Sequence, residues 1–148
     1  MRQFQELFLK VLKGLFAKFK ISEKDSISTL ENLSRYIFSK SHFNATGAKY
    51  AAFMPRNGET SVFRISDIPD DEIWDIGENH VGENIEPSLK GRADIVCSDV
   101  KRIGLDVVPE TSNHPLHANI VSWPAEKDAQ LELAIMLAKT SNFSRKPL

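Results

Sequence analysis

The hydrophobic and polar positions of residues 1–20 repeat with the period of an α-helix. At about 100° per residue, nine large apolar side chains fall on one broad arc, and Glu6 with four basic side chains falls on the other. The apolar set is Phe4, Leu7, Phe8, Leu9, Val11, Leu12, Leu15, Phe16 and Phe19. The pattern predicts an amphipathic helical extension that must bury this arc, because an isolated helix of its length is marginal in water. It can pack on its own domain, on a partner protein or second copy, or on a membrane surface, and packing on protein is preferred.

A second helix is predicted over residues 29–40. Ser28 and Glu31 have the spacing of a capping box, in which each side chain bonds the other residue's backbone N–H. Leu30, Leu33, Tyr36 and Ile37 then share one helical face.

The period changes after residue 48. Residues 49–66 contain one apolar segment before Asn57-Gly58 and one after it. This Asn-Gly pair is typical of tight hairpin turns, so a β-hairpin is predicted. In its second strand Val62 and Arg64 face one way, and Phe63 and Ile65 face the other.

The rest of the chain alternates helices and strands. A helix is predicted to begin near Pro69, followed by a loop of about a dozen residues over 82–94 and a short helix that ends near Gly104. Two strands at 105–110 and 117–122 precede a last helix that opens at Pro124. The apolar stripe of this helix is Leu131, Ala134, Ile135 and Ala138. The prediction is one α+β domain over residues 28–141, a small mixed or antiparallel sheet with packed helices.

Composition adds broad constraints. The chain has 148 residues, 41% hydrophobic and 26% charged, which is typical of one globular domain, and its net charge of −1 gives no overall attraction to nucleic acid or an anionic membrane. The single cysteine, Cys97, cannot form an internal disulfide, and no signal peptide or apolar run of 18 residues is present. We therefore expect a cytoplasmic protein without integral membrane association.

The charge is unevenly distributed. Residues 1–20 carry five basic side chains against one acid, whereas residues 67–87 carry eight acids and no Lys or Arg. The acidic stretch should repel a polyanion, so nucleic acid is not expected to bind there.

His114 and His117 raise the question of a metal site. Pro115 lies between them, and side chains three apart on a strand point to opposite faces, so the two rings are not expected to share a metal. A bend at Pro115 could still bring both rings together, but zinc would then need one or two more ligands. The further ligands that zinc needs, among them His42, His80 and Cys97, have no recognisable spacing. No metal is predicted.

Four side chains are candidates for a polar site. His117 and Asn119 would project from one strand face, where they could serve recognition or acid–base chemistry, or bond only neighbouring backbone. Arg64 stands in an apolar strand, so an ion pair with the acids at 70–78 is the preferred interpretation. The alternative is an anion-binding pocket that Arg64 forms with Arg92 and His117. No Gly-rich phosphate loop or Gly-x-Ser-x-Gly elbow is present, and no cofactor is predicted.

The segments "SRYIFSKSHF", "SVFRISDIPDDEIWDIGENHV", "KGRADI", "GLDVVP" and "HANIVSWPAEKDAQ" resemble a family of small, uncharacterised bacterial cytoplasmic proteins over about residues 34–139. This resemblance implies no activity. The order of a Val-Phe-Arg strand, a Gly-Leu pair and a His-containing strand before an Ala-rich helix is also similar to ADP-ribosyltransferase-like and RNA phosphotransferase folds, although no matching third-motif glutamate is present.

Two functions follow as hypotheses. The first is a non-enzymatic binding or accessory protein of the bacterial cytoplasm that meets a protein partner or a second copy through residues 1–20. The second is a small enzyme acting on a phosphate-bearing substrate, a nucleotide or RNA end, with Arg64, Arg92 and His117. A pocket that contains all three side chains would favour the enzyme, and their dispersal would favour the binding protein.

Overall fold

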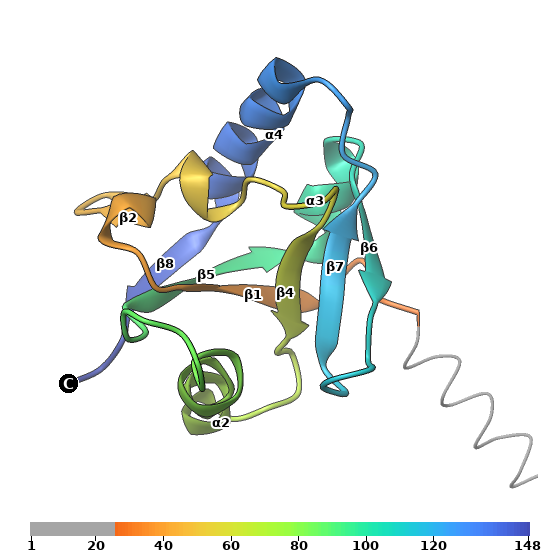
Figure 1. Cartoon of the computed structure of the whole chain (residues 1–148). Coiled ribbons are helices and arrows are strands. Elements are labelled where there is room, and N and C mark those ends of the chain that lie inside the picture. Colours follow the sequence, from red (N-terminus) through yellow and green to blue (C-terminus); the bar gives the residue numbers. More distant parts are fainter. Residues whose placement is uncertain (1–25) are drawn as a thin grey trace, which may run out of the picture.

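A six-stranded antiparallel sheet forms the centre of the fold (Figure 1). This computed structural model describes residues 26–148, so the amphipathic helix expected over residues 1–20 lies outside the described residues. The strand order is β6-β7-β4-β1-β5-β8. The strands are β1 (Asn32–Ile37), β4 (Thr60–Arg64), β5 (Gly91–Val96), β6 (Asp106–Pro109), β7 (His117–Val121) and β8 (Asn142–Arg145). The α+β prediction is confirmed.

Helices cover both faces of the sheet. On one face α3 (Cys97–Arg102), α4 (Lys127–Thr140) and the short η2 (Tyr50–Ala52) pack over the larger apolar core. On the other face α2 (Asp70–Asp75) continues into the π-helical turn η3 (Ile76–Val81) over a smaller core. A turn, η1 (Lys40–His42), and a small hairpin of β2 (Phe43–Asn44) and β3 (Gly47–Ala48) complete the elements. None of the helices in the described part of the chain is long and apolar enough to cross a membrane.

The sheet opens between its two central strands. β1 is paired with β5 over six residues but with β4 over only two, at Leu33–Arg64 and Ser34–Phe63. Beyond this short junction the strands diverge, and in Figure 1 β1 and β5 run across the direction of β4 and β7. The sheet is therefore two three-stranded halves that share one corner.

The helix predicted over residues 29–40 is wrong, because this segment is the central strand β1. Its side chains alternate, with Leu33 and Ile37 in the larger core and Tyr36 in the smaller one. A central strand buried on both faces carries apolar residues in helix-like spacing, which misleads a periodicity argument. Only the Glu31 half of the predicted capping box exists: Ser28 N donates to Glu31 Oε2 at 3.1 Å, whereas Ser28 Oγ accepts from Leu30 N at 3.2 Å rather than from Glu31 N. These bonds close a turn that leads into the strand.

The hairpin prediction is half confirmed. Asn57 and Gly58 form a turn with φ of 53° and 78°, and the second segment is β4. The two positive φ values are those of the tight turn expected for Asn-Gly. The first segment is not a strand, because β4 already has β1 and β7 as neighbours, and residues 50–52 form η2 instead.

The later elements follow the prediction with local differences. The helix after Pro69, the short helix before Gly104 and the two strands are confirmed. The loop is shorter than predicted, since β5 begins at Gly91. In α4 the buried stripe is Ala134, Leu137 and Ala138, whereas Ile135 is exposed. The strand β5 and the edge strand β8 were not predicted.

Leucine truncation distinguishes the strand from the predicted helix. Leu33→Ala should lower the free energy of unfolding by about 2–5 kcal/mol, because Leu33 is fully buried. Leu30→Ala is the matched control and should change it by less than about 0.5 kcal/mol, because Leu30 is 82% exposed. Urea denaturation measures both, and equal losses would support the helix, in which the two leucines share a face.

Candidate functional site

Arg64, Arg92 and His117 do not share a pocket. Arg64 projects from the face of the larger core, where its Nε lies 2.6 Å from Glu31 Oε1. Arg92 and His117 project from the opposite face, since they are paired with Tyr36 and Phe63 of the smaller core. The ion pair predicted for Arg64 exists, but the prediction that its partner lies at 70–78 is wrong.

Arg92 holds α2 on the sheet. Its buried guanidinium bonds Asp70 at 2.9 Å and Asp94 at 3.2 Å and lies 4.7 Å from the centre of the Trp74 ring. Burial raises the pKa of the Asp94 carboxyl, and the charge of Arg92 opposes that rise. These contacts make Arg92 a structural residue.

A cavity of about 580 Å³ lies where the sheet opens. Its polar lining comes from β1, η1, the 54–60 turn, β4 and β7, which are far apart in the sequence. The side chains that matter below are Arg35, His42, Arg56, Glu59, Ser61 and Asn119. Of the four sequence candidates, only Asn119 lines this cavity.

Arg35 fills the gap between β1 and β4. Its Nε donates to the carbonyl oxygen of Ala52 at 2.8 Å and its Nη1 to that of Ser61 at 3.0 Å. The β1–β4 pairing has ended before Ser61, so the guanidinium takes the place of the missing backbone donor. Within the described residues Arg35 donates hydrogen bonds from Nε and Nη1 and none from Nη2. The side chain lines the cavity.

The cavity has an excess of positive charge. Burial, and secondarily the charge of Arg56, lowers the pKa of Arg35 to about 10, so the guanidinium is still charged at neutral pH. Burial, and secondarily the charge of Arg35, lowers the pKa of His42. Over residues 26–148, no carboxylate forms a salt bridge with Arg35 or Arg56. The one acid of the lining, Glu59, accepts a hydrogen bond from Asn119 Nδ2 at 3.0 Å.

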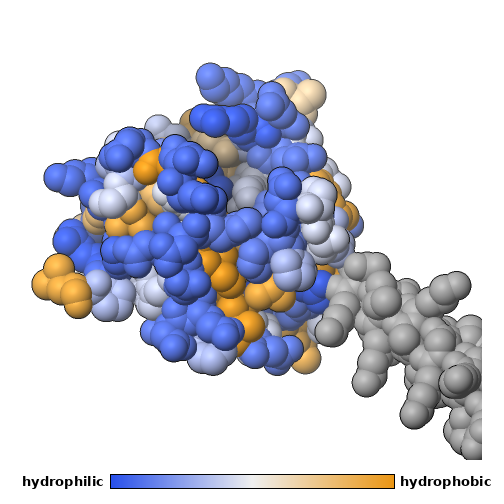
Figure 2. Space-filling model, turned by 60° about the horizontal axis from the view of Figure 1, so that its bottom comes forward, coloured by the Kyte–Doolittle hydropathy of each residue, from blue (hydrophilic) through white to orange (hydrophobic). Residues whose placement is uncertain are grey.

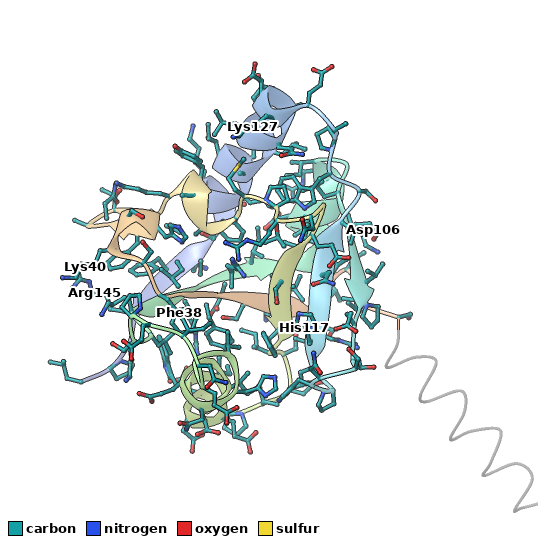
Figure 3. All side chains as sticks on the ribbon, in the orientation of Figure 1. Phe38, Lys40, Asp106, His117, Lys127 and Arg145 are labelled. Carbon is teal, nitrogen blue, oxygen red and sulfur yellow. The ribbon has the colours of Figure 1, made fainter. Side chains whose placement is uncertain are left out.

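His117 links Ser61 to Glu110. Its Nε2 lies 2.6 Å from Ser61 Oγ, and its Nδ1 lies 2.7 Å from the Glu110 carbonyl oxygen and 3.1 Å from Glu110 Oε2 (His117 is labelled beside β4 in Figure 3). A carbonyl oxygen can only accept, so Nδ1 carries the proton in the neutral ring. Nε2 is then an acceptor, and the Ser61 hydroxyl donates to it.

Glu110 is charged when it faces His117. A hydrogen bond from Ser112, followed by one from His117, lowers the pKa of the Glu110 carboxyl, and burial opposes this only in part. The arrangement of hydroxyl, imidazole and carboxylate is the one that activates a serine in many enzymes.

His114 and His117 lie on the same side of the sheet, contrary to the prediction from strand alternation. The ring centres of His114 and His117 are 5.4 Å and 5.2 Å from that of Phe63, and His80 lies 4.6 Å from His114. The strand begins only at His117, so alternation does not apply to His114. Burial, then the charges of His80 and His117, lowers the pKa of His114. Within residues 26–148 no group of three or more His, Cys, Asp or Glu residues is arranged to hold a metal.

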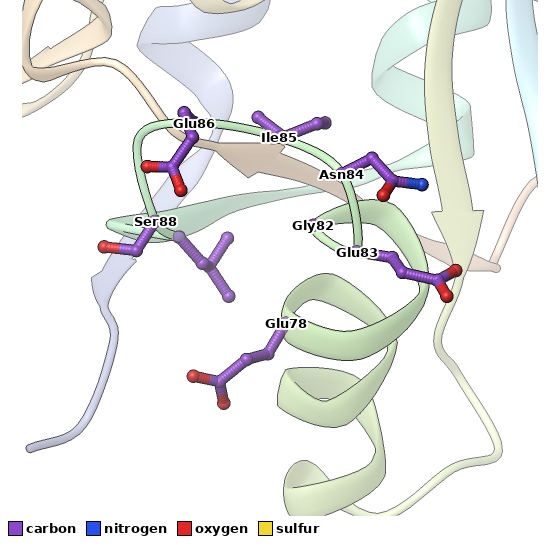
Figure 4. A pocket seen from close by; sticks show the side chains of 8 residues that line it. Glu78, Gly82, Glu83, Asn84, Ile85, Glu86 and Ser88 are labelled. Carbon is purple, nitrogen blue, oxygen red and sulfur yellow. The ribbon is translucent and has the colours of Figure 1, made fainter.

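A second cavity, of about 470 Å³, lies under the 82–89 loop (Figure 4). Glu78, Glu83 and Glu86 line it, but the carboxylate of Glu83 points away from the other two, and Glu78 pairs with Lys146. These acids do not converge on one point, so the cavity offers no cation site.

Arg35, Arg56 and Ser61 were missed by the sequence analysis. Arg35 interrupts an apolar segment, "NLSRYIF", as Arg64 does in "SVFRIS", so the same criterion could have selected it. Ser61 gives no such signal, because its role depends on a strand pairing with residues 56 positions away.

No protein-family model, curated protein or solved structure matches the chain. The resemblance to small bacterial proteins therefore stays a prediction, and the function has to be argued from the geometry of the site.

The tautomer of His117 can be measured directly. Long-range ¹H–¹⁵N NMR at pH 8 should show the proton on Nδ1 and none on Nε2, because the Glu110 carbonyl oxygen accepts from Nδ1. A ring protonated on Nε2 would show that the Ser61–His117–Glu110 arrangement is wrong. The ring of His42, for which no such bond to a carbonyl oxygen exists among the described residues, gives the reference signals in the same spectrum.

Proposed function

We propose that the protein is a binding protein whose cavity between β1 and β4 receives an anionic group, a phosphate or a carboxylate. The single observation that carries the proposal is Arg35, a half-buried guanidinium without a carboxylate partner in the described structure that lines the cavity. Burying a charge is costly unless it is compensated, and two carbonyl oxygens compensate it only in part. An anion would complete the compensation.

The chemistry of the lining fits such a ligand. A guanidinium matches the planar, paired acceptors of carboxylate and phosphate, and Arg35 is preorganised because two backbone oxygens fix its plane. Arg56 adds an exposed second cation at the rim. Glu59 lies at the same cavity but is bonded to Asn119.

For the wider role we propose an accessory protein of the bacterial cytoplasm that acts with a protein partner, which residues 1–20 would contact. The single buried thiol of Cys97 supports a reducing compartment. The face that carries α2 is largely hydrophilic, with apolar residues in limited areas (Figure 2). That surface supports recognition through polar contacts rather than through a broad apolar patch at this face. The dispersal of Arg64 and Arg92 removes the support for the enzyme that the sequence suggested.

Substitution of Arg35 tests the proposal. Calorimetric titration with inorganic phosphate and with sulfate should show binding to the unaltered protein that Arg35→Gln weakens at least about tenfold, as expected for loss of a charged hydrogen-bond donor. Arg56→Gln should weaken it less, because Arg56 is exposed. Arg102→Gln, an exposed arginine on α3, is the matched control and should leave it unchanged. Equal affinity in all three variants would contradict the proposal, and Arg56→Gln keeps the test valid if Arg35→Gln does not fold.

Binding should depend on pH through His42. Sulfate keeps its charge between pH 8 and pH 5.5, whereas His42, neutral at pH 8 because its pKa lies below 6.5, gains a proton as the pH falls. Protonation adds a positive charge beside Arg35, Arg56 and Glu59, so sulfate affinity should rise toward pH 5.5, by about tenfold for each unit by which the anion raises the pKa of His42. His42→Gln should flatten the profile. A profile unchanged by this substitution would exclude His42 from the site.

A further inference from the structure

We propose that Ser61 is a nucleophile, activated by His117 and oriented through Glu110, and that it cleaves esters whose acyl part carries a phosphate or carboxylate group. The choice of substrate rests on the proposed anion binding, whereas the nucleophile itself rests on an independent set of contacts. The two can therefore fail separately.

Three contacts define the nucleophile. Ser61 Oγ donates to His117 Nε2 at 2.6 Å, which places the acceptor nitrogen where it can take the hydroxyl proton. The Glu110 carbonyl oxygen fixes the ring tautomer, and Glu110 Oε2 faces Nδ1 at 3.1 Å, where it stabilises an imidazolium. The His117 ring also packs at a tilt of 60° against the Phe63 ring, with centroids 5.2 Å apart, which restricts the orientation of the imidazole.

Ser61 also borders the cavity. It lines the cavity together with Arg35, whose Nη1 bonds the Ser61 carbonyl oxygen at 3.0 Å. The residue is half-buried on the side of β4 where the pairing with β1 has ended. A substrate whose anionic group binds at Arg35 or Arg56 would therefore lie beside the nucleophile, and the guanidinium of Arg35 would stabilise negative charge that develops there.

The reaction is an acyl transfer in two steps. Ser61 Oγ attacks the carbonyl carbon while its proton moves to His117 Nε2, and the ester C–O bond then breaks as His117 returns the proton to the leaving alcohol. Water attacks the acyl-serine with His117 as base. The acid is released and the Ser61 hydroxyl is restored. No oxidant, reductant or metal is needed.

Covalent labelling of the full chain tests the nucleophile. A fluorophosphonate probe should attach to Ser61, with loss of fluoride, and peptide mass spectrometry should locate the adduct. Ser61→Ala should abolish labelling at this position, and His117→Ala should slow it at least about a hundredfold. Ser144→Ala, on the exposed edge strand β8, is the matched control and should label at the original rate.

Ester hydrolysis tests the substrate class and the positioning role of Glu110. The mono-p-nitrophenyl ester of glutaric acid should be hydrolysed, and Arg35→Gln should slow it at least about tenfold more than it slows neutral p-nitrophenyl acetate. Glu110→Gln should shift the rising limb of the pH–rate profile to lower pH, because loss of the carboxylate destabilises the imidazolium. A merely structural role of Glu110 would leave the position of that limb unchanged.

The outcomes separate the two proposals. An unaltered protein that binds sulfate through Arg35 but shows no fluorophosphonate adduct on Ser61 would overturn the nucleophile and leave the binding function intact. Labelling of Ser61 that depends on His117, without sulfate binding, would support the nucleophile and overturn the anion site. Hydrolysis of both esters with equal sensitivity to Arg35→Gln would overturn the substrate class.

Discussion

The bond between the Arg35 guanidinium and the Ser61 carbonyl oxygen connects the two halves of the sheet beyond their shared corner. The halves meet in only two residue pairs, so carbonyl groups beside the gap need a donor other than a neighbouring strand. Arg35 satisfies one of them on β4 and another on η2, which packs under α4. The cavity exists because a side chain, rather than a backbone strand, closes this gap.

β4 borders both the opening in the sheet and the candidate site. Its alternating residues direct Val62 into the larger core, while Ser61 and Phe63 lie on the side of His117. The same strand therefore contributes to both features. The backbone carbonyl of Ser61 holds Arg35 at the cavity, and the Ser61 side chain bonds His117. Any change that alters the β1–β4 corner should therefore affect anion binding and the reactivity of Ser61 together.

Local signals in the sequence predicted much of the outer part of the fold. The Asn57-Gly58 turn, the helix after Pro69 and the strands around residues 106 and 117 are set by turn residues and by short-range periodicity, and these were confirmed. The central strand β1 was mistaken for a helix because burial on both faces hides its alternation. The ion pair predicted for Arg64 exists, but its partner is Glu31. Glu31 lies in the segment 29–40 that was predicted to be a helix, so the sequence did not suggest it.

The site itself was less accessible from the sequence. His117 and Asn119 were selected because they share a strand face, and both do contact polar partners near the cavity. The partners of His117 are Ser61 on β4 and Glu110, and the partner of Asn119 is Glu59 in the turn before β4. The identity of such partners depends on strand register. Arg35 became significant only once β1 was recognised as a strand beside an incompletely paired neighbour.

The most direct test of this account is the Arg35 side chain itself, observed by ¹H–¹⁵N NMR during a titration with inorganic phosphate. The account predicts that the Arg35 Nε–H signal is visible and protected from solvent exchange before phosphate is added, since Nε bonds the Ala52 carbonyl oxygen. It further predicts that this signal shifts in a saturable way with phosphate while that of Arg92, paired with Asp70 and Asp94, stays in place. An Arg35 signal that exchanges rapidly, or that does not respond at phosphate concentrations that shift the signals of exposed arginines, would contradict the central claim.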